Sequence, residues 1–167
     1  MGSRDEDRFA RLVHEHSGAV GNYLRRRLYP LTTSDLDDLV EETMIVVWRR
    51  LDSVPDGAEL PWMLGVARNV LRNARRSKNR RSNFEATLSP PKNEASAEDS
   101  VIADTSVRDA LAGLNDDERE IVLLNAWDGL DTHALSMYFS ISTNAAAVRL
   151  SRAQSRFREL LGASEVH

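Results

Sequence analysis

The chain has 167 residues, enough for one domain or two small ones, and its 41% hydrophobic content suffices for a core of ordinary size. The absence of cysteine excludes a disulfide framework and any thiolate metal site. No secretory-type apolar segment follows the N-terminus, and the longest apolar run, residues 44–48, is too short to cross a bilayer. We therefore expect a cytoplasmic protein without membrane insertion.

Three helices are predicted in the first half of the chain. Apolar residues at steps of three, four or seven over residues 5–29 indicate a helix with one buried face. A second helix is predicted from an N-cap at Ser34 to about Ser53, with several acids in its first turn. The turn residues 54–57 then separate it from a third helix, whose apolar stripe runs through residues 63–74.

The third helix has the most informative feature of the sequence, a basic run over residues 60–81 that contains no acid although the whole chain has a formal net charge of -4. Exposed helix faces usually mix both signs of charge, so this run indicates a surface for a polyanion, with nucleic acid as the first candidate. An ordinary solvated face is the alternative interpretation. The basic residues are Arg68, Arg72, Arg75, Arg76, Lys78, Arg80 and Arg81.

Helical periodicity is absent from residues 82–105, where five acids stand against one lysine and Pro, Ser and Ala are frequent. This composition predicts a flexible acidic linker. No alternating strand pattern of useful length occurs anywhere in the sequence. The chain is therefore predicted to be all-α, with two small helical domains at residues 4–81 and 106–162.

The second domain has the pattern of a helix-turn-helix. Asn115 and Glu118 form the pattern of a capping box at the start of one helix. Asp131 or Thr132 can then cap a short helix, and residues 140–142 form a tight turn before a longer helix that is rich in arginine. In this arrangement the second helix enters the major groove of DNA.

In their order and spacing these segments resemble the extracytoplasmic-function group of bacterial sigma factors, the subunits that bring RNA polymerase to promoters. The resemblance implies a protein without enzymatic activity, cofactor or metal, which is a monomer when free. It rests on residues 38–43 with Val47 and Trp48, on Pro61 and Trp62 with residues 67–69, on the basic run 75–81, and on the helix-turn-helix through Ser142 and residues 149–152.

The resemblance implies two contacts with the polymerase core. In the family, the acidic second helix binds a coiled coil of the largest subunit, and the second domain binds the flap of the second-largest subunit. Complementation of the helix dipole explains acids in the first turn without a partner, but it does not explain Glu41 and Glu42. The residues assigned to the coiled-coil contact are Asp35, Asp38, Leu39, Glu41, Glu42, Thr43 and Trp48.

The family uses the third helix and the loop before it to open the minus-ten promoter element and read it as single-stranded DNA. Such a site needs cations for phosphates and a pocket for an unstacked base. Asn69, at the family's Ala-Arg-Asn position, can bind a base edge, while the seven basic residues named above supply the phosphate contacts. Many relatives have Asp at the position of Asn73. Trp62 is either a core lid or a platform for stacking.

In the second domain, the resemblance predicts that the longer helix reads the duplex minus-thirty-five element. Many relatives carry Lys or Arg, then Ser, where this chain has Ala147 and Val148, so hydrogen bonding to guanine is lost there and contact with thymine methyl groups is favoured. We predict an unusual upstream element, with Arg152 as the main guanine reader. The base-reading positions fall on Ala147, Val148, Ser151 and Arg152, and Ser142, Thr143 and Arg149 are suited to phosphate contacts.

Two further roles follow from the resemblance. The acidic linker of the family lies in the RNA exit path and active cleft of the polymerase, although a plain tether explains its composition equally well. A dedicated anti-sigma factor commonly masks the binding faces of the family, so such a partner is possible here.

Other classes of protein fit the sequence less well. Asp37, Asp38 and Glu41 match the DDxxE magnesium pattern of terpenoid enzymes, but that chemistry needs a second metal motif and a large aromatic cavity. His14 and His16 point to different sides of a helix and form no metal site. A recombinase would need strands in its catalytic domain. The main alternative is a helix-turn-helix regulator that binds duplex operators without polymerase, usually as a dimer.

Overall fold

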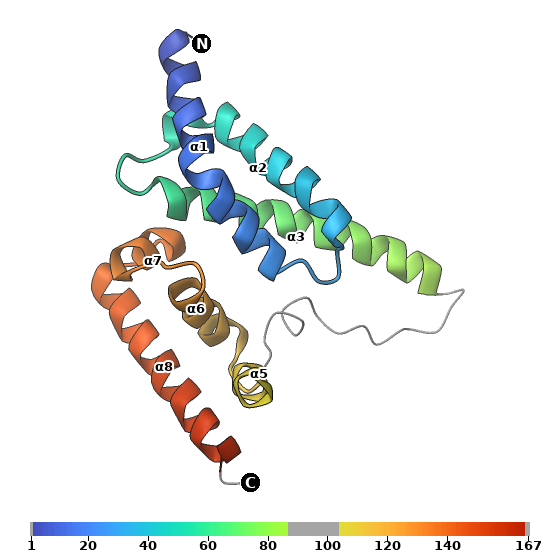
Figure 1. Cartoon of the computed structure of the whole chain (residues 1–167), viewed down its shortest axis with the longest axis vertical. Coiled ribbons are helices and arrows are strands. Elements are labelled where there is room, and N and C mark those ends of the chain that lie inside the picture. Colours follow the sequence, from blue (N-terminus) through green and yellow to red (C-terminus); the bar gives the residue numbers. More distant parts are fainter. Residues whose placement is uncertain (1, 87–103, 166–167) are drawn as a thin grey trace. The chain divides into compact units, whose positions relative to one another are not determined.

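The computed structural model describes residues 2–86 and 104–165, and the chain divides into two units, Met1–Ser100 and Val101–His167 (Figure 1). Within these described ranges the backbone forms helices, turns and bends but no strand, which confirms the all-α prediction. Most of the predicted acidic linker, residues 87–103, lies outside the described residues. Among the described helices, none combines the length and apolar character needed to cross a membrane.

The first unit contains three long helices, α1 (Ser3–Arg26), α2 (Leu36–Arg49) and α3 (Glu59–Ala86), each of which packs against the other two. Their apolar stripes meet in one core, as the three-four spacing predicts. The apolar residues of this core that are at most 1% exposed are Val20, Tyr23, Leu24, Val47, Met63, Leu64 and Ala67.

The start of α2 differs from the prediction. The cap is Thr32 and not the predicted Ser34. A short 3-10 helix, η1 (Thr33–Asp35), lies between Thr32 and α2. Thr32 N donates to the Asp35 carboxylate at 2.9 Å, as in a capping box. This capping box begins three residues before Asp35, the residue that directly precedes α2. At its other end α2 stops at Arg49, and a second 3-10 helix, η2 (Leu51–Ser53), covers the rest of the predicted span.

The end of α3 also differs from the prediction. The helix continues to Ala86, so the first five residues of the predicted linker, 82–86, are helical. Figure 1 shows this last part of α3 running beyond the start of α2. Apolar periodicity ends at Ala74, but the arginine-rich run that follows contains neither glycine nor proline, and arginine and lysine have high helix propensity. A helix can therefore extend past the core that holds its first half.

The second unit is built around α8 (Thr143–Glu165), against which α5 (Thr105–Ala112), α6 (Asp116–Ala126) and α7 (Thr132–Phe139) all pack (Figure 1). The capping box at Asn115 is confirmed, because Glu118 N donates to Asn115 Oδ1 at 2.8 Å and Asn115 N donates to Glu118 Oε1 at 3.0 Å. The cap of α7 is Asp131, whose carboxylate accepts a hydrogen bond from Ala134 N.

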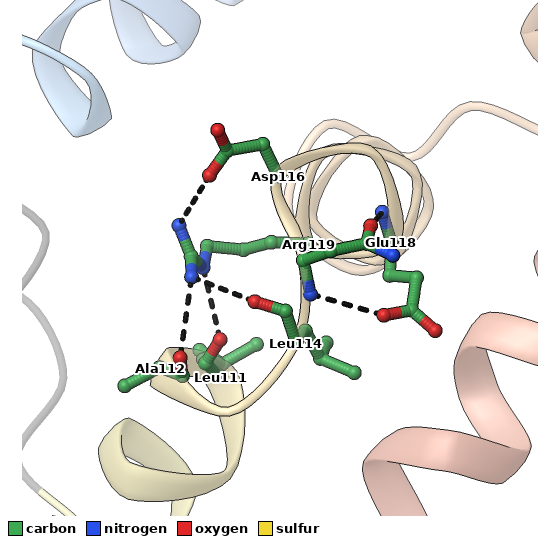
Figure 2. Close-up of polar contacts among 7 residues, drawn as sticks. Leu111, Ala112, Leu114, Asp116, Glu118 and Arg119 are labelled. Atoms are coloured by element: carbon green, nitrogen blue, oxygen red, sulfur yellow. Dashed lines mark hydrogen bonds and ion pairs between the residues drawn. The ribbon is translucent and has the colours of Figure 1, made fainter.

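Arg119 of α6 holds the end of α5 in place. Its guanidinium donates to the carbonyl oxygens of Leu111 at 2.9 Å, Leu114 at 3.0 Å and Ala112 at 3.4 Å, as Figure 2 shows. Asp116 lies 3.4 Å from the same side chain. The last carbonyls of a helix have no partner inside the helix. Arg119 supplies donors to the Leu111 and Ala112 carbonyls at the end of α5, and so it ties α5 to α6.

Candidate nucleic-acid interface

The outward face of α3 forms a continuous polar ridge. Asn69, Asn73, Arg76 and Arg80 follow one another at steps of four, three and four residues and are all exposed. Side chains at this spacing lie on one side of a helix, so two amides and two guanidinium groups face solvent together. We call these four residues the α3 ridge. A shallow groove with a volume of ≈ 470 Å³ lies along it, lined by Asn73, Arg76, Asn79, Arg80 and Asn83.

Arg75 does not belong to this surface. It leaves α3 on another side, where its Nε donates to the carbonyl oxygen of Tyr29 at 3.0 Å and its NH2 group donates to the carbonyl oxygen of Arg27. These bonds join α3 to the segment after α1. These two bonds hold the Arg75 guanidinium within the fold, so the structure does not support the predicted phosphate contact of Arg75.

The other predicted cations of α3 point in several directions. Arg72, Arg76, Arg80 and Arg81 are exposed, whereas Arg68 and Lys78 are half-buried. Lys78 and Arg81 lie toward the start of α2. The hydrogen bond from Thr32 N–H is the main cause that holds the pKa of Asp35 below its usual value, and the charges of these two cations lower the pKa further.

Only part of the predicted acidic face of α2 is available to a partner. Asp38, Glu41 and Glu42 are exposed. Leu39 is 3% exposed and Thr43 is 0% exposed, and the Thr43 hydroxyl donates to the carbonyl oxygen of Leu39 at 2.7 Å. The assignment of Leu39 and Thr43 to a polymerase contact is wrong, since both lie inside the core.

The half-buried Trp48 lines an apolar groove that the sequence did not indicate. Its ring meets Phe9 of α1 edge to face, with centroids 5.2 Å apart. The groove has a volume of ≈ 440 Å³ and includes Ile45, which is 41% exposed. The signal that the sequence offered for this groove was an isoleucine one turn after Glu41, on the same side of the helix. The lining residues are Glu6, Phe9, Glu41, Met44, Ile45 and Trp48.

Trp62 is half-buried at the start of α3. The Arg50 guanidinium lies over its ring, 5.2 Å from the centroid. This contact is a cation–π arrangement. A base that stacked on this face of Trp62 would have to displace Arg50, so the structure favours the interpretation of Trp62 as a lid.

The helix-turn-helix of the second unit consists of α7, a turn at residues 140–142 and α8. Ser140 has a φ of 56°, the left-handed conformation that ends α7. Ser142 then caps α8, because its hydroxyl oxygen accepts a hydrogen bond from Ala145 N at 3.0 Å. The turn therefore sets the direction in which α8 leaves α7.

The predicted base-reading residues share the outer face of α8. Ala146 and Ala153 are 0% and 1% exposed and define the buried side of the helix. Arg149 leans toward α7, with its guanidinium 5.3 Å from the Phe139 ring centroid. Thr143 is exposed at the first turn. On the side opposite the buried alanines the exposed residues are Ala147, Val148, Ser151 and Arg152.

No group of three His, Asp or Glu side chains that could hold a metal ion occurs in the described part of the chain. Three exposed surfaces stand out in the described residues, namely the α3 ridge, the outer face of α8, and the acid-flanked groove between α1 and α2.

Comparison with known proteins gives one family. Residues 12–81, which run from α1 to the basic part of α3, match the family Sigma-70 region 2. The RNA polymerase sigma factor CarQ of Myxococcus xanthus is 30% identical over 169 residues, which cover 96% of this chain and 93% of CarQ. The RNA polymerase sigma factor NccH of Alcaligenes xylosoxydans xylosoxydans is 26% identical over 174 residues, which cover 97% of this chain and 91% of NccH.

Two solved structures share the fold. CnrH, in complex with the cytosolic domain of CnrY, superimposes with a TM-score of 0.60 and 22% identity, covering 93% of this chain and 88% of CnrH. The sigma factor RpoE of Bartonella quintana, in complex with the anti-sigma factor NepR, gives a TM-score of 0.61 and 20% identity, covering 92% of this chain and 96% of RpoE.

Proposed function

Because the chain belongs to the extracytoplasmic-function family of RNA polymerase sigma factors and directs RNA polymerase to promoters, we propose that the α3 ridge binds the minus-ten promoter element as single-stranded DNA. The observation that carries the proposal is the exposed row of amides and guanidinium groups on one face of α3, within the stretch that matches Sigma-70 region 2. Arginines bind phosphates without regard to sequence, and amides can bind the edge of an unstacked base.

The position of Asn69 supports its role as the base-binding residue. It is exposed at the start of the ridge, one helical turn before Asn73. Asn73 stands where many relatives have Asp, so the ridge loses a negative charge that would repel a phosphate. This second amide extends the surface that can bind a base edge.

The exposed acids of α2 and the adjoining groove support a contact with the polymerase core. Glu41 lines the groove beside Ile45 and Trp48 and so joins a charged surface to an apolar one. A basic partner with apolar side chains suits such a surface, because apolar burial supplies affinity and charge supplies orientation. We assign this contact to the coiled coil of the largest subunit.

The outer face of α8 suits duplex DNA in the major groove. Ala147 and Val148 present methyl groups there and no hydrogen-bond donor, which favours thymine at the bases they meet. Arg152 follows one turn later and can bind the O6 and N7 atoms of guanine. We assign this face to the minus-thirty-five element.

An anti-sigma factor is a further partner that the relatives suggest. RpoE was solved with an anti-sigma factor and CnrH with the cytosolic domain of CnrY. These two proteins share the fold of this chain and nearly its whole length. We propose that the present chain also binds an inhibitor protein, which would cover one or more of the three surfaces.

The test of the proposed function uses the full chain, bacterial core RNA polymerase without a sigma subunit, and a library of promoter sequences. We expect a complex and defined transcription start sites, which would give both promoter elements in one experiment. A monomeric preparation that binds duplex operator DNA tightly but no core polymerase would contradict the proposal and favour the operator-binding regulator.

A further inference from the structure

The last turns of α3 expose an aromatic side chain that none of the roles above uses. Phe84 is 77% exposed, whereas the other exposed large apolar residues of the described chain, such as Met137 and Ile45, are 43% exposed or less. Single exposed apolar residues are common on protein surfaces and do not by themselves indicate a site. The position of Phe84 must therefore supply the argument.

Phe84 continues the α3 ridge. It follows Arg80 by four residues, so the steps along the ridge from Asn69 to Phe84 are four, three, four and four. This spacing keeps all five side chains on one side of the helix. The groove beside the ridge reaches Asn83, the residue next to Phe84. The aromatic ring thus lies at the end of a face that otherwise consists of amides and cations.

Such a face has the composition of a single-strand binding site. Proteins that bind single-stranded nucleic acid combine cations along the backbone with aromatic side chains on which bases stack. The ridge supplies guanidinium groups from Arg76 and Arg80 and an amide from Asn69. The exposed ring of Phe84 supplies the stacking surface that the rest of the ridge lacks.

The length of the helix gives the spacing between the two base contacts. Fifteen residues separate Asn69 from Phe84, which is about 22 Å along the helix axis at 1.5 Å per residue. Stacked nucleotides are about 3.4 Å apart and unstacked ones are farther apart, so this length corresponds to at most roughly six nucleotides. The two residues therefore meet opposite ends of a short single-stranded segment.

We propose that Phe84 stacks on an unpaired DNA base at most about six nucleotides from the base at Asn69 and so marks the far edge of the single-stranded segment. This inference rests on the proposed binding of the minus-ten element by α3. It adds a second base-binding position, formed by residues that the sequence assigned to the linker.

The experiment measures the affinity of the holoenzyme, assembled from the full chain and core polymerase, for a single-stranded oligonucleotide that contains the minus-ten segment. Phe84→Ala is expected to weaken binding about 5- to 150-fold, the range that corresponds to loss of one base–aromatic stack. Phe84→Leu is expected to bind the oligonucleotide as weakly as Phe84→Ala, while Phe84→Trp is expected to keep full affinity. The dependence of affinity on salt is expected to stay unchanged in all three variants, because no phosphate contact is lost.

A series of oligonucleotides with one abasic nucleotide each locates the stacked base. At one position, at most about six nucleotides from the Asn69-dependent one, removal of the base is expected to abolish the difference between the wild type and Phe84→Ala. Wild-type affinity of Phe84→Ala or of Phe84→Leu would overturn the stacking role. Arg76→Ala separates the two proposals: if it weakens binding while Phe84→Ala does not, only the stacking inference fails. If Arg76→Ala and Phe84→Ala both bind the oligonucleotide as the wild type does, the proposed binding of DNA by the α3 ridge is wrong as well as the stacking inference.

Discussion

Arg75 Nε lies 3.0 Å from the carbonyl oxygen of Tyr29 and donates a hydrogen bond to it, although the two residues are 46 positions apart in the sequence. A second donor of the same guanidinium binds the carbonyl oxygen of Arg27. Arg76, the next residue of α3, is exposed on the ridge. Two adjacent arginines of one basic run therefore differ in environment, since one is bonded within the fold and the other is exposed on the ridge.

Replacement of these two arginines separates stability from binding. Arg75→Ala is expected to lower the free energy of unfolding by about 1 to 3 kcal/mol, because a charged donor leaves two backbone carbonyls. Arg76→Ala is expected to change stability by less than about 0.5 kcal/mol. Urea unfolding followed by circular dichroism measures both values, and equal destabilisation by the two variants would contradict the assigned roles.

The same pair tests how DNA binds to the ridge. If about four cations touch phosphate, the logarithm of the affinity for single-stranded DNA falls with the logarithm of salt concentration with a slope of about −3. Arg76→Ala is expected to reduce this slope by about 0.7, and Arg75→Ala is expected to leave it unchanged. Titration of holoenzyme with single-stranded DNA at several salt concentrations gives the slopes, and a slope near zero in the wild type would refute the phosphate contacts.

Charge reversal on α2 is expected to abolish binding to core polymerase. Both Glu41 and Glu42 are exposed, so the double variant Glu41→Lys with Glu42→Lys keeps the fold while it opposes a basic partner. Asp52→Lys, at an exposed position of η2, is the matched control and is expected to bind normally. Binding is measured by gel filtration with core polymerase, alongside helical content. Full binding by the double variant would show that the acids of α2 do not contact the polymerase.

Arg152→Ala is expected to change the DNA specificity of the second domain. Loss of a bidentate contact to guanine costs about 1 to 3 kcal/mol and relaxes the preference at one base pair. Arg156 lies on the same helix but pairs with Glu159 at 3.5 Å, so Arg156→Ala serves as the control. Selection of minus-thirty-five sequences with each variant measures the preference. Uniform weakening across all sequences would mean that Arg152 contacts phosphate alone.

Arg119→Ala is expected to loosen the second domain. The variant leaves the carbonyl oxygens of Leu111 and Leu114 without their guanidinium donor, at a cost of about 1 to 3 kcal/mol. Arg156→Ala is again the control, since its exposed ion pair with Glu159 contributes little. Hydrogen exchange of the amides of α5 measures the local opening. Unchanged protection in Arg119→Ala would contradict the role of this side chain.

The helical class, the cap at Asn115, the basic run of α3 and the family to which the chain belongs could all be predicted from the sequence. These features depend on residues near one another in the chain. Apolar spacing defines one buried face, and a capping box joins positions three apart. A run of like charge can be recognised whatever the fold.

Which members of each motif are exposed depends on the tertiary structure. Thr43 lies in the acidic motif of α2 but is inside the core, and Arg75 lies in the basic run but binds carbonyls 46 and 48 positions away. The sequence assigned Phe84 to the linker, whereas the structure places it on α3. Helical spacing fixes the direction in which a side chain leaves the axis of its helix. What lies in that direction depends on the packing of other helices.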